Sequence, residues 1–141
     1  MDIEKAKKIL KENNYTCVLC KGETVYTSYD RGVAPILKLI ENNTDISGFS
    51  VADKVIGKAA AILFSMAGVK EIFTDIISIP AKLYLEQKGI DLSFNTLTEK
   101  IINRTGDGLC PMETLVMNVN DENKAFLLIK EKLKELRKEK Q

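Results

Sequence analysis

The sequence predicts an α/β protein, built as a three-layer α/β/α sandwich around a mixed sheet. A β-rich hairpin near the start of the chain indicates an antiparallel pair of strands. A strand, a helix and a second strand then follow one another within residues 71–95, which indicates a right-handed crossover and a parallel pair. The 141 residues suit one compact domain, so we expect a single domain over residues 1–141 with a charged C-terminal helix from about residue 121.

The first part of the chain predicts a helix, a hairpin and a second helix. Asp2 is placed to cap the first helix, whose apolar residues recur on one face. The runs YTCVLC (15–20) and ETVYTS (23–28) are rich in β-forming residues, and the Lys-Gly dipeptide between them favours a tight turn. The segment VAPILKLIEN (33–42) predicts a short helix that follows the hairpin.

The segment from Ser50 to Gly68 predicts the central helix. Ser50, with Asp53 three residues later, matches a capping-box pattern, and Gly68 is placed to end the helix. Residues 51–68 are apolar nearly all round, which is typical of a buried helix. Gly57 inside such a helix costs roughly 1 kcal/mol against alanine, which indicates that a backbone or a ligand approaches closely there.

The second half of the chain predicts two strands and two helices. The run EIFTDIIS (71–78) is mostly apolar, as expected of a strand in the middle of a sheet. Pro80 lies in the first turn of the next helix, which Gly89 ends. IDLSFN (90–95) predicts the parallel strand, and a short helix follows from Pro111.

The last predicted helix begins near Asn120. Its apolar residues recur every three or four positions, and its tail KEKLKELRKEKQ is typical of a charged face in solvent. The apolar stripe is shorter than three heptads, so we expect it to pack on the chain's own core rather than in a coiled coil. A homo-oligomer stays open as an alternative.

Composition excludes several classes of function. The formal net charge of +1 creates no field that attracts nucleic acid or a membrane, and no apolar run approaches the ~20 residues that span a bilayer. The chain has no histidine, which excludes Ser-His and Cys-His nucleophiles and removes the commonest metal ligand. The start MDIEKAKKIL lacks the apolar region of a signal peptide, and three cysteines are an odd number. We therefore expect a cytoplasmic protein with reduced thiols.

Cys17 and Cys20 have the spacing of half a zinc site. On a strand, positions three apart point to opposite faces of the sheet, so the two sulfur atoms diverge. The chain also lacks a second Cys or His pair that would complete four ligands. We interpret the two cysteines as small apolar residues of the hairpin.

Three segments carry a resemblance to a known family. They are SYDRGVAP (28–35), ADKVIGKAAA (52–61) and IINRTGDGLCPMET (101–114). On these residues the chain resembles a small uncharacterised bacterial family, a domain of unknown function with a cytidine-deaminase-like fold. The resemblance implies that fold, and it implies no activity.

The resemblance also implies that the zinc ligands of the deaminases are replaced. Deaminases of this fold place His or Cys followed by Ala-Glu at the start of the central helix, where this chain has residues 52–55, Ala-Asp-Lys-Val. They place Pro-Cys-x-x-Cys at the start of the next helix, where this chain keeps Pro80 and has Ala81 and Tyr84 in place of the thiolates. Neither side chain binds zinc, so we expect no cofactor and no zinc-dependent deamination.

The segment INRTGDGLCPMETLV (102–116) contains the strongest candidate site. Its two glycines permit close approach of the backbone to a ligand, and Arg104 can hold a phosphate or a carboxylate through two hydrogen bonds. Cys110 lies at the N-cap position of the helix that starts at Pro111, where a thiolate is stabilised and anions bind. The predicted ligand-binding residues of this segment are Asn103, Arg104, Thr105, Gly106 and Gly108.

A second candidate segment is the predicted start of the central helix. Lys54 and Lys58 would share one helix face, and a lysine in a buried helix is rare without a partner. We predict both lysines as ligand-binding residues, with Asp53 beside them, and we expect this turn to meet residues 103–113 in one cleft.

Three functions stay open at this point. The first, which we favour, is a metal-free module that binds a nucleotide or another anionic small molecule. The second is an enzyme with Cys110 as nucleophile and Glu113, Asp53 or a lysine as its acid–base partner. The third is an oligomer-forming scaffold. Against both site hypotheses stands a structural interpretation, in which Glu113 caps its helix, Cys110 packs in the core and Arg104 pairs with Asp107.

Overall fold

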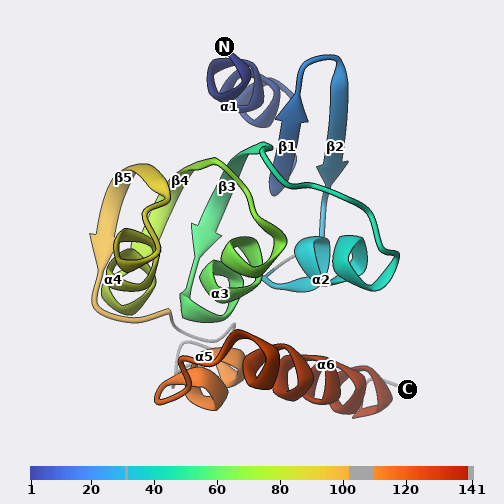
Figure 1. Cartoon of the computed structure of the whole chain (residues 1–141), viewed down its shortest axis with the longest axis vertical. Coiled ribbons are helices and arrows are strands. Elements are labelled where there is room, and N and C mark those ends of the chain that lie inside the picture. Colours follow the sequence, from blue (N-terminus) through green and yellow to red (C-terminus); the bar gives the residue numbers. More distant parts are fainter. Residues whose placement is uncertain (31, 102–109, 140–141) are drawn as a thin grey trace.

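The computed structural model describes residues 1–30, 32–101 and 110–139 of the chain (Figure 1). Its helices and strands follow one another as α1 (Asp2–Asn13), β1 (Cys17–Lys21), β2 (Thr24–Ser28), α2 (Ala34–Glu41), β3 (Ser50–Ile56), α3 (Lys58–Ala67), β4 (Glu71–Ser78), α4 (Ile79–Gln87), β5 (Asp91–Thr98), α5 (Pro111–Val116) and α6 (Glu122–Glu139). No helix in these ranges is both long enough and apolar enough to cross a membrane.

The five strands form one mixed sheet in the order β2-β1-β3-β4-β5. Strand β1 runs antiparallel to both β2 and β3, whereas β3, β4 and β5 are parallel to one another. Helix α3 connects β3 to β4 and helix α4 connects β4 to β5, as expected for parallel neighbours. The predicted α/β class, the mixed sheet, the hairpin and the parallel pair are therefore confirmed.

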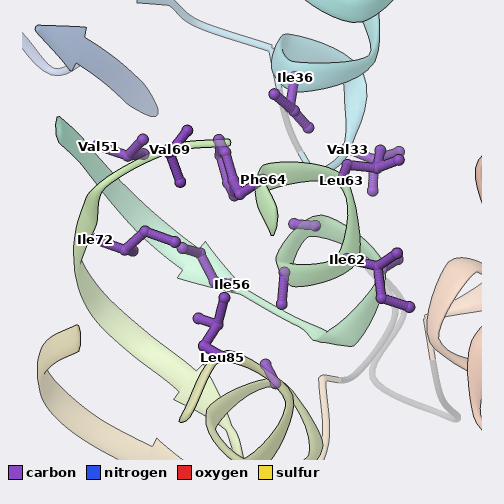
Figure 2. Packing of buried hydrophobic residues seen from close by; sticks show 14 of the residues in the cluster. Val33, Ile36, Val51, Ile56, Ile62, Leu63, Phe64, Val69, Ile72 and Leu85 are labelled. Atoms are coloured by element: carbon purple, nitrogen blue, oxygen red, sulfur yellow. The ribbon is translucent and has the colours of Figure 1, made fainter. Parts of the chain in front are cut away.

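The two faces of the sheet are covered unequally (Figure 1). Of the helices in the described ranges, α1 is the one that packs on the first face, where Ala6 and Leu10 join Val18, Cys20 and Ala52 in a small core. Helices α2, α3 and α4 cover the other face and form the main core, in which Figure 2 shows Phe64 and Ile62 of α3. Helices α5 and α6 pack on the outer side of α3.

The prediction of one central helix over residues 51–68 was wrong in its first third. Residues 50–56 form strand β3, and the helix begins only at Lys58, with Gly57 as its N-cap residue. An apolar segment without a clear period does not distinguish a buried strand from a buried helix. Val51, Val55 and Ile56 are β-branched and favour the strand. The capping-box pattern of Ser50 and Asp53 therefore had no structural meaning.

Smaller corrections concern the ends of other elements. Asp2 lies inside α1 and does not cap it; its carboxylate accepts a hydrogen bond from the Gly22 backbone amide at 3.1 Å. Strand β5 extends past the predicted residue 95 to Thr98. Helix α6 begins at Glu122, and Asp121 accepts a hydrogen bond from the Lys124 amide at 2.9 Å, as an N-cap does.

In strands β3 and β4 the regular alternation of side chains between the two faces of the sheet is interrupted, at the same level in both strands. Val51 and Ile56 lie an odd number of positions apart, so a regular strand would point them to opposite faces. Both nevertheless belong to the main core, and so do Ile72 and Ile77 of β4 (Figure 2). We call this level the phase shift. It places Asp53 just before the irregularity and leaves Val55 38% exposed just after it.

Candidate functional site

Most of the predicted ligand-binding loop lies outside the described residues. This holds for Asn103, Arg104, Thr105, Gly106 and Gly108. The structure does describe the residues on which the other predictions rest: Asp53, Lys54, Lys58, Cys110 and Glu113. It brings some of these together and separates others.

Glu113 lies at the N-terminus of α3. Its carboxylate accepts hydrogen bonds from the backbone amides of Lys58 at 2.7 Å and Ala59 at 3.0 Å. These amides have no partner within the helix, and the positive end of the helix dipole favours a carboxylate there. Glu113 therefore caps a helix far away in sequence, and not its own helix as the structural interpretation had it.

Gly57 makes this contact sterically feasible. A Cβ atom at this position would overlap the Glu113 carboxylate. The prediction was that a backbone or a ligand approaches Gly57 inside a helix; Gly57 is instead the N-cap residue of α3, and the group close to it is a side chain of the same protein. Glu113 of the one segment thus meets Gly57 and Lys58 of the other in a packed contact, in which the carboxylate fills the space above Gly57; the shared cleft stays a prediction.

Lys58 and Cys110 lie at the same junction. The Lys58 side chain is buried, and its Nζ donates a hydrogen bond to the Met117 carbonyl at 3.1 Å. Burial lowers the pKa of Lys58, and the nearby Glu113 carboxylate opposes this shift. Cys110 is half-buried and packs against the main core, and its amide donates to the Ile101 carbonyl at 3.0 Å. The lysine and the carboxylate predicted as acid–base groups thus both hold backbone groups.

Lys54 lies elsewhere. The prediction that Lys54 and Lys58 share a helix face was wrong, because Lys54 is in strand β3. Its side chain is exposed on the α1 side of the sheet, where it lines a groove together with α1.

Asp53 is a buried residue of strand β3, on the sheet face that the main core covers. It is only 6% exposed, and its Oδ1 accepts a hydrogen bond from the Val55 amide at 3.3 Å. Burial raises the pKa of Asp53 to about 7, against the opposing effect of hydrogen bonds from Val55, Lys54 and the Cys17 thiol. Cys17 is its neighbour on β1, and burial together with the Asp53 carboxylate raises the pKa of that thiol. The carboxylic acid and the thiol are thus paired inside the protein.

The two helix starts at which the resemblance to deaminases implied zinc ligands do not fit a metal. Because α3 begins at Lys58, its start is Gly57-Lys58-Ala59 and not residues 52–55. These residues offer no thiolate or imidazole, and two of their amides already bind Glu113. At the start of α4, the Ala81 side chain is a methyl group, and the Tyr84 hydroxyl donates to Glu122 at 3.1 Å.

A groove that the sequence did not predict lies between α1 and the exposed part of the sheet. Its volume is about 580 Å³. We call it the α1 groove. It is lined by Glu4, Lys7, Lys8, Leu10, Lys11 and Asn14 of α1 and the following turn, and by Lys54, Phe73, Asp75 and Asn95 of the sheet.

Two contacts describe the sheet side of the α1 groove. Lys7 Nζ lies 4.5 Å from the centre of the Phe73 ring, in a cation–π contact. Asn95 Nδ2 donates a hydrogen bond to Asp75 Oδ1 at 2.7 Å. Of all groove residues only Lys54 was predicted. The lysine-rich polar face of α1 was visible in the sequence, but a solvated helix face has the same composition.

Comparison with known proteins identifies similar chains. A family model described as TM1506, a domain of unknown function (DUF1893), matches residues 5–133. A solved structure, the crystal structure of a DUF1893 family protein (TM1506) from Thermotoga maritima, is similar with a TM-score of 0.86 and 25% sequence identity. The match covers 93% of this chain and 89% of that chain. No curated protein matches.

Proposed function

The chain belongs to the DUF1893 family, whose description assigns no function, and from the geometry of its α1 groove we propose that it binds an anionic small molecule of the nucleotide class. The observation that carries the proposal is the charge of the groove. Four lysines line it against two carboxylates, in a protein whose net charge is only +1. Positive charge is thus concentrated around one hollow.

The lysines come from two directions. Lys7, Lys8 and Lys11 extend from α1, and Lys54 extends from β3 on the sheet side. An anion in the groove therefore meets ammonium groups on both walls, which a flat surface with the same number of lysines would not provide. Among the ion pairs of the described residues, none involves these four lysines.

The size and floor of the groove suit a nucleotide. A volume of about 580 Å³ falls in the range of ligand pockets, roughly 300–1,000 Å³. Phe73 supplies an aromatic face and Leu10 an apolar side chain, and aromatic rings stack on nucleobases. A second hollow of about 480 Å³, between α5 and α6, contains Glu131, Lys132 and Glu135 and lacks this excess of positive charge.

We also propose that the fold is of the cytidine-deaminase-like type. The strand order and the two helices that start at the ends of neighbouring parallel strands support this. Because the helix starts do not fit zinc, the proposal includes no deamination step. A stoichiometric zinc ion in the purified protein, with release of ammonia from a nucleoside, would contradict this part.

The alternative of an enzyme with Cys110 as nucleophile stays a prediction. Glu113, one of its predicted acid–base partners, is held by the amides of α3. Alkylation of Cys110 across pH tests the alternative: reaction in the folded protein well below the usual thiol pKa of about 8.5 would support it.

Calorimetric titration of the full chain with AMP, GMP, CMP, UMP and pyrophosphate tests the binding proposal. Lys54→Met keeps the length of the side chain and removes its charge, and we expect it to weaken binding roughly three- to tenfold, as for loss of one partly exposed charged contact. Lys124→Met, at an exposed lysine of α6, is the matched control, and we expect it to leave the affinity unchanged. Absence of binding for the whole panel, or equal effects of the two variants, would reject the proposal.

A further inference from the structure

We propose, resting on the function proposed above, that the α1 groove selects a guanine nucleotide, and that Asp75 and Asn95 are the residues that determine this specificity. The proposal rests on the pattern of hydrogen-bond acceptors on the sheet side of the groove. The lysines attract any anion, so the identity of the base must be read by other groups.

Lys54, Asp75 and Asn95 lie in one row across three parallel strands. The register pairs Asp53 with Thr74 and Thr74 with Phe94, and it pairs Val55 with Ile76. The residues between these pairs therefore stand at the same level of β3, β4 and β5. All three side chains line the α1 groove, so the row offers one ammonium group, one carboxylate and one amide side by side.

The Asp75 carboxylate determines how the Asn95 amide is oriented. A carboxylate only accepts hydrogen bonds, so the amide must turn its NH₂ group toward Asp75, as the 2.7 Å contact shows. The Asn95 carbonyl oxygen then points away from that contact. The pair thus leaves acceptors available: the second oxygen of Asp75, the remaining lone pair of its first oxygen and the carbonyl of Asn95.

Such a set of neighbouring acceptors matches one nucleobase edge best. Guanine presents two adjacent donors, the ring N1–H and the exocyclic N2 amino group, and a carboxylate can accept from both. Adenine and cytosine place a ring acceptor beside their amino group, and uracil has a single N–H between two carbonyl oxygens. An acceptor of the base facing Asp75 would leave two polar groups unpaired against each other, which is unfavourable.

Phe73 places an aromatic surface beside this pair. It precedes Asp75 by two positions on β4, so both side chains belong to the same face, about 7 Å apart along the strand. A base whose edge meets Asp75 thus has an aromatic ring within reach. Lys7 already lies over this ring, so Lys8, Lys11 and Lys54 are the lysines available to the phosphate group, which completes a site for a nucleoside monophosphate.

The test compares GMP with IMP, which differs from it only by the missing 2-amino group, and with AMP, by calorimetric titration of the full chain. We expect GMP to bind at least about tenfold more tightly than IMP or AMP. Asp75→Asn replaces one acceptor by a donor and is expected to abolish that preference. Asp91→Asn, at an exposed aspartate at the start of β5, the strand that contains Asn95, is the matched control and is expected to retain it.

The outcomes separate the two proposals. If GMP, IMP and AMP bind with equal affinity and Lys54→Met weakens all three, the guanine assignment is overturned. The proposal that the α1 groove binds anions then still stands. A preference for GMP that Asp75→Asn does not change would also overturn the role of Asp75. If neither the nucleotides nor pyrophosphate binds in a Lys54-dependent manner, the proposed function itself fails, and the guanine assignment fails with it.

Discussion

Asp53 is an acidic residue that lies almost fully buried. It stands at the phase shift of β3, where its carboxyl group accepts a hydrogen bond from the amide two residues ahead. Thr74, its neighbour on β4, donates to the carbonyl of Ile76, also two residues ahead. The two buried polar side chains thus satisfy backbone groups where the strands lose their regular alternation, which explains why polar residues stand there.

The buried carboxyl group makes folding stability depend on pH. The pKa of Asp53 is about 7 in the folded protein against an ordinary value of 3.8. Between these values the folded state binds the proton more tightly than the unfolded state does, so stability falls as pH rises from about 4 to about 7. We expect the wild type to lose on the order of 3 kcal/mol more than Asp53→Asn between pH 4 and pH 8 in urea unfolding. Parallel pH curves for the two proteins would contradict the assignment.

The contributions of Gly57 and Glu113 to folding stability depend on each other, because the two residues are in direct contact. Gly57 has φ of −100°, which any residue adopts. A larger side chain at this position is therefore unfavourable because it overlaps the Glu113 carboxylate, and not because of the backbone conformation. In Gly57→Ala the carboxylate must leave the α3 amides, and we expect a loss of roughly 1–3 kcal/mol. In a Glu113→Ala background the same substitution should cost far less. Equal costs in both backgrounds, measured by urea unfolding, would show that the two residues act independently.

At the scale of elements, one carboxylate of α6 forms hydrogen bonds with two other helices. Glu122 Oε1 accepts hydrogen bonds from Ser65 of α3 at 2.9 Å and from Tyr84 of α4 at 3.1 Å, and Lys88 Nζ lies 3.7 Å away. A single residue at the first turn of α6 thus contacts both α3 and α4. Apolar residues, among them Ala125 and Ile129, complete the packing.

This cluster predicts an unusual tyrosine. Burial and the Glu122 carboxylate raise the pKa of Tyr84 to about 12. In an ultraviolet absorption titration we expect one tyrosine to ionise well after the ordinary value near 10, and Tyr84→Phe to remove that late step. The substitution should also destabilise the protein by about 1–2 kcal/mol through loss of one hydrogen bond to a carboxylate. A late step that persists in Tyr84→Phe would assign it to another tyrosine.

Local patterns predicted most elements, and long-range pairing explains the failures. The hairpin and the strand at 71–78 were predicted because turn residues and β-forming runs are local signals. The strand at 50–56 was missed because its apolar run has no clear period and resembles a helix. For the candidate site, the position of Glu113 near Gly57 was partly foreseen. The row of Lys54, Asp75 and Asn95 was not, because only the register of three parallel strands brings these residues to one level.

At the scale of the whole molecule, charge is distributed unevenly around an almost neutral total. The net charge is +1, whereas the α1 groove collects four lysines. Because these side chains face solvent, salt screens them: the Debye length falls from about 10 Å at 0.1 M to about 3 Å at 1 M. We expect the affinity for GMP to fall several-fold between 0.05 and 0.5 M sodium chloride, while the urea midpoint of the free protein changes little. Salt-independent affinity would argue against lysine-based recognition.

Within the part of the chain that the structure describes, α1 is the one helix that covers its face of the sheet, and Cys20 lies beneath it. Cys17 belongs to the core on the opposite face, as expected for strand positions three apart. Cys20 is fully buried, so we expect reagents that alkylate thiols to reach it only when α1 or the hairpin around it opens. The rate at which Cys20 is alkylated therefore measures how often this part of the protein opens. We expect a compound that bridges α1 and the sheet to lower this alkylation rate. Ligands can then be screened by mass spectrometry of the peptide that contains Cys20.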